Sequence, residues 1–279
     1  MLIVGELINT SRKAVKTAVD TGDAAAIQEI ARNEAEAGAH YIDVNCGTMI
    51  SKEEQMMEWL VKVVQERVTD TPLCIDSPNC RALQAGLKLH RNGQPMINSI
   101  TAQEERFSQV IPLVLEYKAK VVALLMDDAG MPDTYERRKE ITDRLIPRLI
   151  KDGVPAGDIY VDPLIKPIST GTDAGQEVLQ TLAYIGHEYP DVHTICGLSN
   201  ISFGLPNRRV LNRIFCIETM TMGMDSFILD PLDKKLVGDI YAGAALLGKD
   251  NGISESAPEG PVRRRLNDLG TIPGMGSLV

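Results

Sequence analysis

The strongest constraint on the fold of this chain is a regular alternation of short apolar runs with longer amphipathic segments. The short runs are rich in Ile, Val and Leu and are bounded by turn residues, whereas the longer segments have helical length. Such alternation indicates parallel βαβ units. We predict strands at Leu2–Gly5, Tyr41–Val44, Leu73–Ile75, Met96–Ile97, Val121–Met126, Ile159–Val161, Thr194–Leu198 and Phe227–Leu229.

Eight helices are predicted between and after these strands, and eight βα units are the number that closes a TIM barrel. An open, doubly wound sheet is the structural alternative, but it usually has a Gly-rich phosphate loop after its first strand. Here the first strand leads into Glu6-Leu7-Ile8-Asn9 instead, so we predict an α/β fold of the (β/α)8 type. The predicted helices are Ala24–Ala37, Glu53–Val68, Cys80–His90, Glu104–Tyr117, Tyr135–Lys151, Gln176–Tyr189, Val210–Met222 and Lys234–Leu247.

The 279 residues are expected to form one domain followed by a tail. An α/β barrel of about 250 residues is a single domain. After Leu247 the sequence becomes rich in Gly, Pro, Ser and charged residues, with little helical periodicity. We therefore assign residues 1–247 to the barrel and residues 248–279 to an irregular C-terminal tail.

Composition and charge exclude several classes of protein. The net charge of -9 argues against a nucleic-acid-binding surface. Five scattered cysteines without a CxxC pair indicate neither a disulfide framework nor a zinc ribbon. The N-terminus lacks the pattern of a secretory signal, and no apolar stretch reaches the length of a membrane helix. We expect a cytoplasmic protein with no membrane or nucleic-acid partner.

Polar side chains follow every predicted strand, at the end of the barrel where active sites of this fold form. None of them is a lysine, which leaves a Schiff-base mechanism without a nucleophile. None is a histidine, the usual ligand of zinc or non-haem iron. The residues at these positions are Glu6, Asn9, Asp43, Asn45, Asp76, Ser77, Asn98, Ser99, Asp127, Asp128, Asp162, Ser199, Asn200 and Asp230.

A ring of carboxylates and carboxamides suits a neutral heterocycle with several polar edges, such as a pterin. A carboxylate accepts two donors in parallel, and a carboxamide donates and accepts at once. Two alternatives stay open at this point. Asp and Asn at strand ends also cap the helices that follow, and Asp127 and Asp128 with other carboxylates could form a hard-cation site of a hydrolase or lyase.

At these same residues the sequence resembles the pterin-binding barrel family, specifically the methyltetrahydrofolate:corrinoid-protein methyltransferases. The resemblance extends from residue 2 to about residue 245, and its specificity lies in the order of the motifs and their positions on the barrel. The matching segments are Gly5-Glu6-Leu7-Ile8-Asn9, Ile42-Asp43-Val44-Asn45, Cys74-Ile75-Asp76-Ser77, Met96-Ile97-Asn98-Ser99, Tyr160-Val161-Asp162-Pro163-Leu164, Gly197-Leu198-Ser199-Asn200-Ile201-Ser202 and Pro206-Asn207-Arg208-Arg209-Val210-Leu211-Asn212-Arg213.

The resemblance implies a role for each of ten residues. Asp76, Asn98 and Asp162 are expected to anchor the pterin, and Asn200 is expected to bond the methyl-bearing ring nitrogen as the catalytic residue. Asp43 belongs to the pterin-binding set and, with Asp76, is a candidate relay for the proton of that nitrogen. The remaining five line, shape or support the same cavity: Glu6, Asn9, Gly197, Ser199 and Arg208.

The implied reaction is methyl transfer between methyltetrahydrofolate and the cobalt of a corrinoid, with a lean toward the demethylation direction, methyl-corrinoid to tetrahydrofolate. The cobalamin-binding signature Asp-x-His-x-x-Gly is absent from the sequence, so the corrinoid is expected on a separate protein. Folate is then a substrate, no metal is bound, and a homodimer is implied by resemblance.

Two alternative functions remain. A dihydropteroate synthase-like pterin enzyme shares the fold, but its pattern has a Lys on strand seven and Arg-x-His on strand eight. This chain has Gly197-Leu198-Ser199-Asn200 and Phe227-Ile228-Leu229-Asp230 there. The other alternative is a non-catalytic barrel that binds folate.

Overall fold

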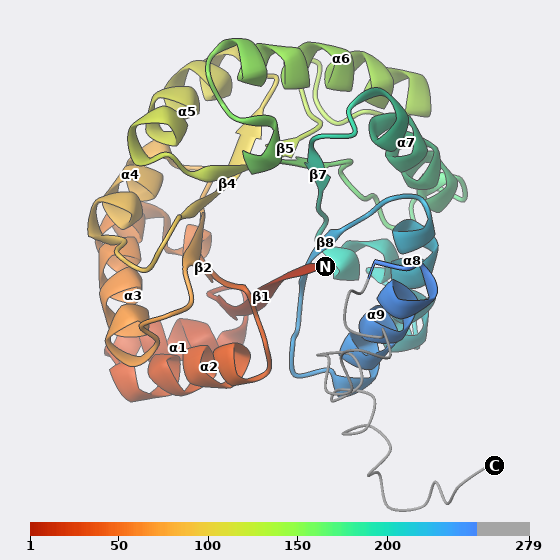
Figure 1. Ribbon diagram of the computed structural model, residues 1–279. Coiled ribbons are helices and arrows are strands. Elements are labelled where there is room, and N and C mark those ends of the chain that lie inside the picture. Colours follow the sequence, from red (N-terminus) through yellow and green to blue (C-terminus); the bar gives the residue numbers. More distant parts are fainter. Residues whose placement is uncertain (250–279) are drawn as a thin grey trace, which may run out of the picture.

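Eight parallel strands form a barrel with the helices outside it in the computed structural model, which describes residues 1–249 (Figure 1). The hydrogen-bonded order is β7-β6-β5-β4-β3-β2-β1-β8, so consecutive strands pair from β1 to β7 and β1 also pairs with β8. This confirms the predicted (β/α)8 barrel. The strands are β1 (Leu2–Asn9), β2 (Tyr41–Asn45), β3 (Leu73–Asp76), β4 (Met96–Thr101), β5 (Lys120–Leu124), β6 (Ile159–Asp162), β7 (His193–Thr194) and β8 (Ser226–Leu229).

The helices surround the strands in chain order, and eight of them lie within two residues of their predicted bounds. The ninth, α1, and three short 3-10 helices were not predicted. The bounds are α1 (Lys13–Thr21), α2 (Ala24–Glu36), η1 (Gly47–Lys52), α3 (Glu53–Arg67), α4 (Cys80–Leu89), α5 (Glu104–Tyr117), α6 (Tyr135–Lys151), η2 (Ala156–Asp158), α7 (Ala174–Glu188), η3 (Leu198–Ser202), α8 (Arg208–Thr221) and α9 (Lys234–Leu246).

Several helices begin at side chains that satisfy their free backbone N–H groups. Asp23 accepts from Ala26 N at the start of α2, and Asn79 accepts from Arg81 N at the start of α4. Asp233 does the same for α9. These caps explain why the helix starts were predicted well, because a capping Asp or Asn directly before an apolar periodic segment is a local signal.

The inside of the barrel contains an apolar layer made of one residue from each of seven strands. Because side chains on a strand alternate between its two faces, the residue two positions later points the same way, one step closer to the carboxyl ends. The apolar layer is Val4, Tyr41, Cys74, Met96, Val122, Tyr160 and Ile195. Two positions later stand Glu6, Asp43, Asp76, Asn98, Leu124, Asp162 and Gly197, which form a mostly polar layer.

The proposed division between barrel and tail remains a prediction. Residues 250–279, the greater part of the expected tail at 248–279, lie outside the described residues. Within residues 1–249, none of the helices combines the length and the apolar character needed to cross a bilayer.

Candidate active site

A cavity of about 360 Å³ opens at the carboxyl ends of the strands and brings most of the candidate residues together. Arg208 is absent from its lining but borders an adjoining cavity, which shares Glu6 and Ser199 with it. The lining of the first cavity, called the mouth cavity below, is Glu6, Asn9, Ser11, Arg12, Asp43, Asp76, Asn98, Asp162, Gly197, Ser199, Asn200 and Ile228.

Asp76 ends β3 and is oriented by a neighbouring amide. Asn45 Nδ2 donates to Asp76 Oδ2 at 2.8 Å, while Asn45 Oδ1 accepts from Gly47 N at 3.0 Å, which fixes the orientation of the amide. Burial raises the pKa of Asp76 to about 6, opposed by this hydrogen bond and by the nearby charge of Arg106. One oxygen of the carboxyl is thus engaged by Asn45, and the residue lines the cavity.

Asp162 and Asp43 are further carboxyl groups with raised pKa values. Asp162 Oδ1 accepts from Leu164 N at 2.8 Å, and burial raises the pKa of Asp162 to about 7. Burial, and then the charge of Asp76, hold the pKa of Asp43 well above its usual range. Asp43 Oδ1 is buried and has no hydrogen-bond partner within residues 1–249. A ligand that brought N–H donors into the mouth cavity would stabilise the ionised forms.

Asn200 lies in η3, where the chain turns inward after the short strand β7. Its backbone N donates to Gly197 O at 3.2 Å. A Cβ atom on Gly197 would lie 3.2 Å from Asn200 Nδ2, so the glycine leaves room for the carboxamide. The predicted strand Thr194–Leu198 began one residue late and ended too far along the chain, because β7 pairs with β6 only at His193 and Thr194.

Arg208, at the start of α8, braces the segment that carries Asn200. Its Nη2 donates to Ser199 O at 2.7 Å and its Nε donates to Ser202 Oγ at 3.1 Å. The hydroxyl of Ser202 in turn donates to Asn212 Oδ1 at 2.6 Å. These bonds tie both ends of η3 to α8, which limits the freedom of the loop.

Arg106 on α5 performs a similar function for β3 and β4, and sequence analysis missed it. Its guanidinium donates to Ser77 O at 2.8 Å, to Pro78 O at 2.6 Å and to Ser99 O at 3.0 Å. Ser77 and Pro78 come directly after the end of β3, and Ser99 comes directly after the cavity residue Asn98. The signal in the sequence is only an arginine near the start of a helix, because its partners are backbone groups.

Ser11 and Arg12 also line the mouth cavity and were not predicted. Arg12 Nη2 donates to Glu6 Oε1 at 2.9 Å, and Ser11 N donates to Asn9 Oδ1 at 2.9 Å. Both lie within three residues after Asn9, the last residue of β1. The predicted strand Leu2–Gly5 was too short, because β1 extends to Asn9.

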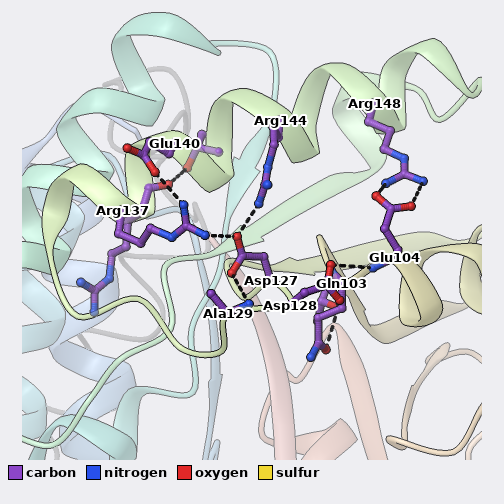
Figure 2. Close-up of polar contacts among 12 residues, drawn as sticks. Gln103, Glu104, Asp127, Asp128, Ala129, Arg137, Glu140, Arg144 and Arg148 are labelled. Carbon is purple, nitrogen blue, oxygen red and sulfur yellow. Dashed lines mark hydrogen bonds and ion pairs between the residues drawn. The ribbon is translucent and has the colours of Figure 1, made fainter.

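Asp127 and Asp128 do not join the polar ring, which corrects the expectation drawn from strand five. That strand ends at Leu124, and Asp127 is a buried acceptor for Arg137, for Arg144 Nη2 at 2.5 Å and for Ala129 N (Figure 2). Asp128 Oδ2 accepts from Glu104 N at 3.4 Å. Two arginines already neutralise Asp127, so it serves as a structural ion-pair acceptor rather than a cavity residue.

The four histidines have positions outside the lining of the two cavities described above. His40 Nδ1 accepts from Ile3 N at 3.1 Å, and His90 Nε2 accepts from Leu73 N at 3.2 Å. His193 bonds Asp225, and His187 bonds Glu188 on the surface. These contacts are structural, which fits the absence of histidine from the strand-end positions.

Comparison with known sequences relates most of the chain to pterin enzymes. The model of the family described as "Pterin binding enzyme" matches residues 5–230. A relative from Eubacterium limosum, "Methylcorrinoid:tetrahydrofolate methyltransferase", is 37% identical over 252 residues, which are 90% of this chain and 92% of the relative. "Methionine synthase" from Mycobacterium tuberculosis is 33% identical over 245 residues, 82% of this chain but only 20% of that longer protein.

Solved structures with the same fold include two bacterial dihydropteroate synthases. The enzyme from Vibrio fischeri aligns with a TM-score of 0.68 at 14% identity, over 89% of this chain and 93% of that chain. The enzyme from Yersinia pestis aligns with a TM-score of 0.65 at 16% identity, over 88% and 93% respectively. At these identities, the likeness shows a shared barrel fold and nothing about activity.

Proposed function

Because the chain belongs to the pterin-binding enzyme family, we propose that it is a methyltransferase whose mouth cavity binds tetrahydrofolate and receives a methyl group from a methylcorrinoid. The relative that shares 37% identity is named for this reaction and is matched along nearly its whole length. The observation that carries the proposal is structural. Five polar residues from five separate strands or turns all border one cavity: Asp43, Asp76, Asn98, Asp162 and Asn200.

These residues match the polar edges of a pterin. Carboxylates accept the paired N–H donors of its pyrimidine ring, a role that fits Asp76 and Asp162, and the carboxamide of Asn98 can donate and accept beside them. An analogue without these groups would leave buried polar atoms unpaired, which gives the site its selectivity. Glu6, Asn9, Gly197 and Ser199 complete the wall around the ring.

In the chemical step, the site must orient the pterin nitrogen that carries the methyl group and must move the proton of that nitrogen. In the direction toward tetrahydrofolate, the pterin nitrogen attacks the methyl carbon, a carbon–nitrogen bond forms, and the carbon–cobalt bond breaks with its electron pair remaining on cobalt. The proton of that nitrogen must then leave. The Asn200 oxygen can accept a hydrogen bond from this N–H and so orient the nitrogen. Asp43 and Asp76, whose pKa values are raised, are proposed to relay the proton through water.

The same residues serve the reverse reaction, in which the pterin nitrogen must be protonated before it can leave. The name of the 37% identical relative favours the methylcorrinoid-to-tetrahydrofolate direction. We further propose that the corrinoid is carried by a separate protein that docks over the mouth cavity, and that the enzyme is a cytoplasmic homodimer without nucleic-acid or membrane partners and without a bound metal of its own.

An optical assay tests the function directly. The protein is mixed with methyltetrahydrofolate and cob(I)alamin, and conversion to methylcobalamin is followed by absorbance. We expect conversion well above the protein-free rate. Folate binding without any spectral change would instead favour a non-catalytic folate-binding barrel. A stoichiometric metal ion in the purified protein would favour a carboxylate-metal hydrolase.

A dihydropteroate synthase activity is the alternative within the same fold. The chain has neither a lysine in Gly197-Leu198-Ser199-Asn200 nor an Arg-x-His in Phe227-Ile228-Leu229-Asp230. A cationic group is needed to hold and release a pyrophosphate leaving group. We therefore expect no condensation of a pterin pyrophosphate with 4-aminobenzoate, and product formation in that assay would overturn the methyltransferase proposal.

A further inference from the structure

Strand β1 contains one more residue than its partner at the point where it enters the mouth cavity. Gly5 pairs with Ile42 and Ile8 pairs with Val44, so three steps along β1 match two steps along β2. The pairing of β1 with β8 ends at Gly5. Such a β-bulge re-aims a side chain and leaves backbone groups without a strand partner. Here, the bulge lies at Glu6 and Leu7.

A carboxyl group from a surrounding helix satisfies the freed backbone group. Glu34 on α2 is fully buried, and its Oε1 accepts from Leu7 N at 2.8 Å. Its Oε2 is also buried and has no hydrogen-bond partner in the part of the chain that the structure describes. Burial raises the pKa of Glu34 to about 8, so the group is mainly neutral at pH 7. A neutral side chain with one accepting oxygen is therefore sufficient for this contact.

Gly5 provides the space for the Glu34 carboxyl. A Cβ atom at position 5 would lie 2.7 Å from Glu34 Cδ, which is closer than real Cβ contacts allow. The absence of a side chain at Gly5 and the presence of the carboxyl at Glu34 are thus complementary. Strand β4 shows the same arrangement, because its register also shifts after Asn98 and Arg106 of α5 bonds the Ser99 carbonyl there.

We propose that Glu34 is a positioning residue of the methyl-transfer site, which acts by holding the β1 bulge so that Glu6 and its partner Arg12 stand at the cavity wall. This rests on the function proposed above. Glu34 does not line the mouth cavity, whereas Glu6 and Arg12 do. Its effect on the substrate must therefore pass through β1. Without the Glu34 carboxyl, the partly buried Leu7 N–H would lose its hydrogen-bond partner, and the bulge would lose the contact that favours this conformation over a regular strand.

The test compares single and double variants in steady-state transfer from methylcobalamin to tetrahydrofolate. The variants are Glu34→Ala, Glu34→Gln, Glu6→Ala and the double variant Glu6→Ala/Glu34→Ala, each with its melting temperature. We expect Glu34→Ala to lower kcat/KM by about tenfold or more, the scale of a lost buried hydrogen bond. Glu34→Gln keeps an accepting oxygen and should stay near the wild-type value. The double variant should be scarcely worse than Glu6→Ala, because the two residues act in series.

Ile27→Ala is the matched structural control, since Ile27 is fully buried on the same helix and its apolar side chain has no oxygen that could accept from Leu7 N. It should lower the melting temperature but leave kcat/KM nearly unchanged. Gly5→Ala, which displaces the carboxyl, should reproduce the defect if Glu34→Ala does not fold. Wild-type kcat/KM in Glu34→Ala, or losses that multiply in the double variant, would overturn the inference.

Failure of the proposed function would look different. In that case the wild-type protein itself would show no transfer, and the same variants would be compared by calorimetric titration with tetrahydrofolate. Weaker binding in Glu34→Ala with normal binding in Glu34→Gln would support the positioning role independently of catalysis. Equal binding in all variants would overturn it.

Discussion

The side chain of Asn200 does not titrate, in contrast to the carboxyl groups of Asp43, Asp76 and Asp162 in the same cavity. Its carboxamide can accept a hydrogen bond from the methyl-bearing nitrogen but cannot supply a proton at neutral pH. The hydrogen bond matters most when charge develops on that nitrogen. We therefore expect Asn200→Ala to lower the methyl-transfer rate by about a hundredfold, the scale seen when one positioned partner of a developing charge is removed, while folate affinity falls only modestly.

Single-turnover rates and calorimetric titration with methyltetrahydrofolate separate the two effects. Asn79→Ala is a suitable control, because Asn79 caps α4 by accepting from Arg81 N and does not line the cavity. Equal losses in rate and affinity in Asn200→Ala, or no loss in either, would reject the role of Asn200.

The raised pKa of Asp162 predicts how folate binding depends on pH. Burial raises this pKa to about 7, so the carboxyl is largely protonated at pH 5.5 and ionised at pH 8. The ionised form accepts two N–H donors and forms the stronger, charge-assisted hydrogen bonds. Below the pKa, binding must also remove a proton, which lowers the observed affinity. We expect tetrahydrofolate to bind more tightly as the pH rises from 5.5 to 8.

Calorimetric titrations across this pH range provide the measurement. Asp162→Asn should bind weakly, with a flatter dependence on pH, because the titrating group near neutrality has been removed. Asp158→Asn is a matched control, since Asp158 bonds Lys120 at the opposite end of the barrel strands. Affinity that stays constant with pH in the wild-type protein would contradict an anchoring role for the ionised Asp162.

At the scale of elements, helix bounds could be predicted closely, whereas strand ends could not. α5 and α6 begin and end at the predicted residues, because caps and apolar periodicity are local properties. β1 and β4 were predicted too short because their second halves contain Glu6 and Asn98. Glu6 lies within the β1 bulge and Asn98 directly precedes the register shift of β4, and no alternation within either strand indicates a bulge that a distant helix stabilises.

The contacts that hold these bulges are equally invisible in the sequence. Glu34 and Arg106 lie on helices and bond backbone groups of β1 and β4. Because every residue of β1 and β4 has backbone N–H and C=O groups of the same kind, the sequence of these strands does not show which residues Glu34 and Arg106 bond. Only the folded barrel shows these pairs. By contrast, the cavity residues could be anticipated, because parallel strands bring their carboxyl ends to the same edge and the order of the strands was known from the alternation.

At the scale of the whole molecule, the alternation of strands and helices was enough to predict the barrel but not which strand ends reach its centre. Asp127 follows strand five just as Asp162 follows strand six, yet it pairs with Arg137 and Arg144 of α6. The difference arises from how far each residue lies along the chain from the end of its strand. Asp162 is the last residue of β6, whereas Asp127 lies three residues beyond β5, where the chain has already turned toward α6.

The closure of the barrel is its weakest point among the described strands. β7 and β8 are joined by the isolated bridge between Gly197 and Ile228, with Ile228 N donating to Cys196 O at 2.8 Å, whereas neighbouring strands from β1 to β6 are joined by ladders of several residue pairs. Figure 1 shows β7 and β8 beside each other at this junction. Regions with few backbone hydrogen bonds open more readily than the rest of a fold. Amides of residues 193–198 and 226–229 should therefore exchange with solvent faster than those of β2 and β3.

A folate in the mouth cavity would contact both sides of this junction, Asn200 on the β7 side and Ile228 with Glu6 on the β8 and β1 side. Binding should then slow hydrogen exchange at residues 193–198 and 226–229 more than elsewhere, because the ligand stabilises the closed form over the open one. Hydrogen–deuterium exchange with and without tetrahydrofolate measures this. In Asn200→Ala, which is expected to bind folate but to lack the contact on the β7 side, the added protection at residues 193–198 should largely disappear. Protection that is uniform over the barrel, or unchanged by the substitution, would contradict a ligand that bridges the junction through Asn200.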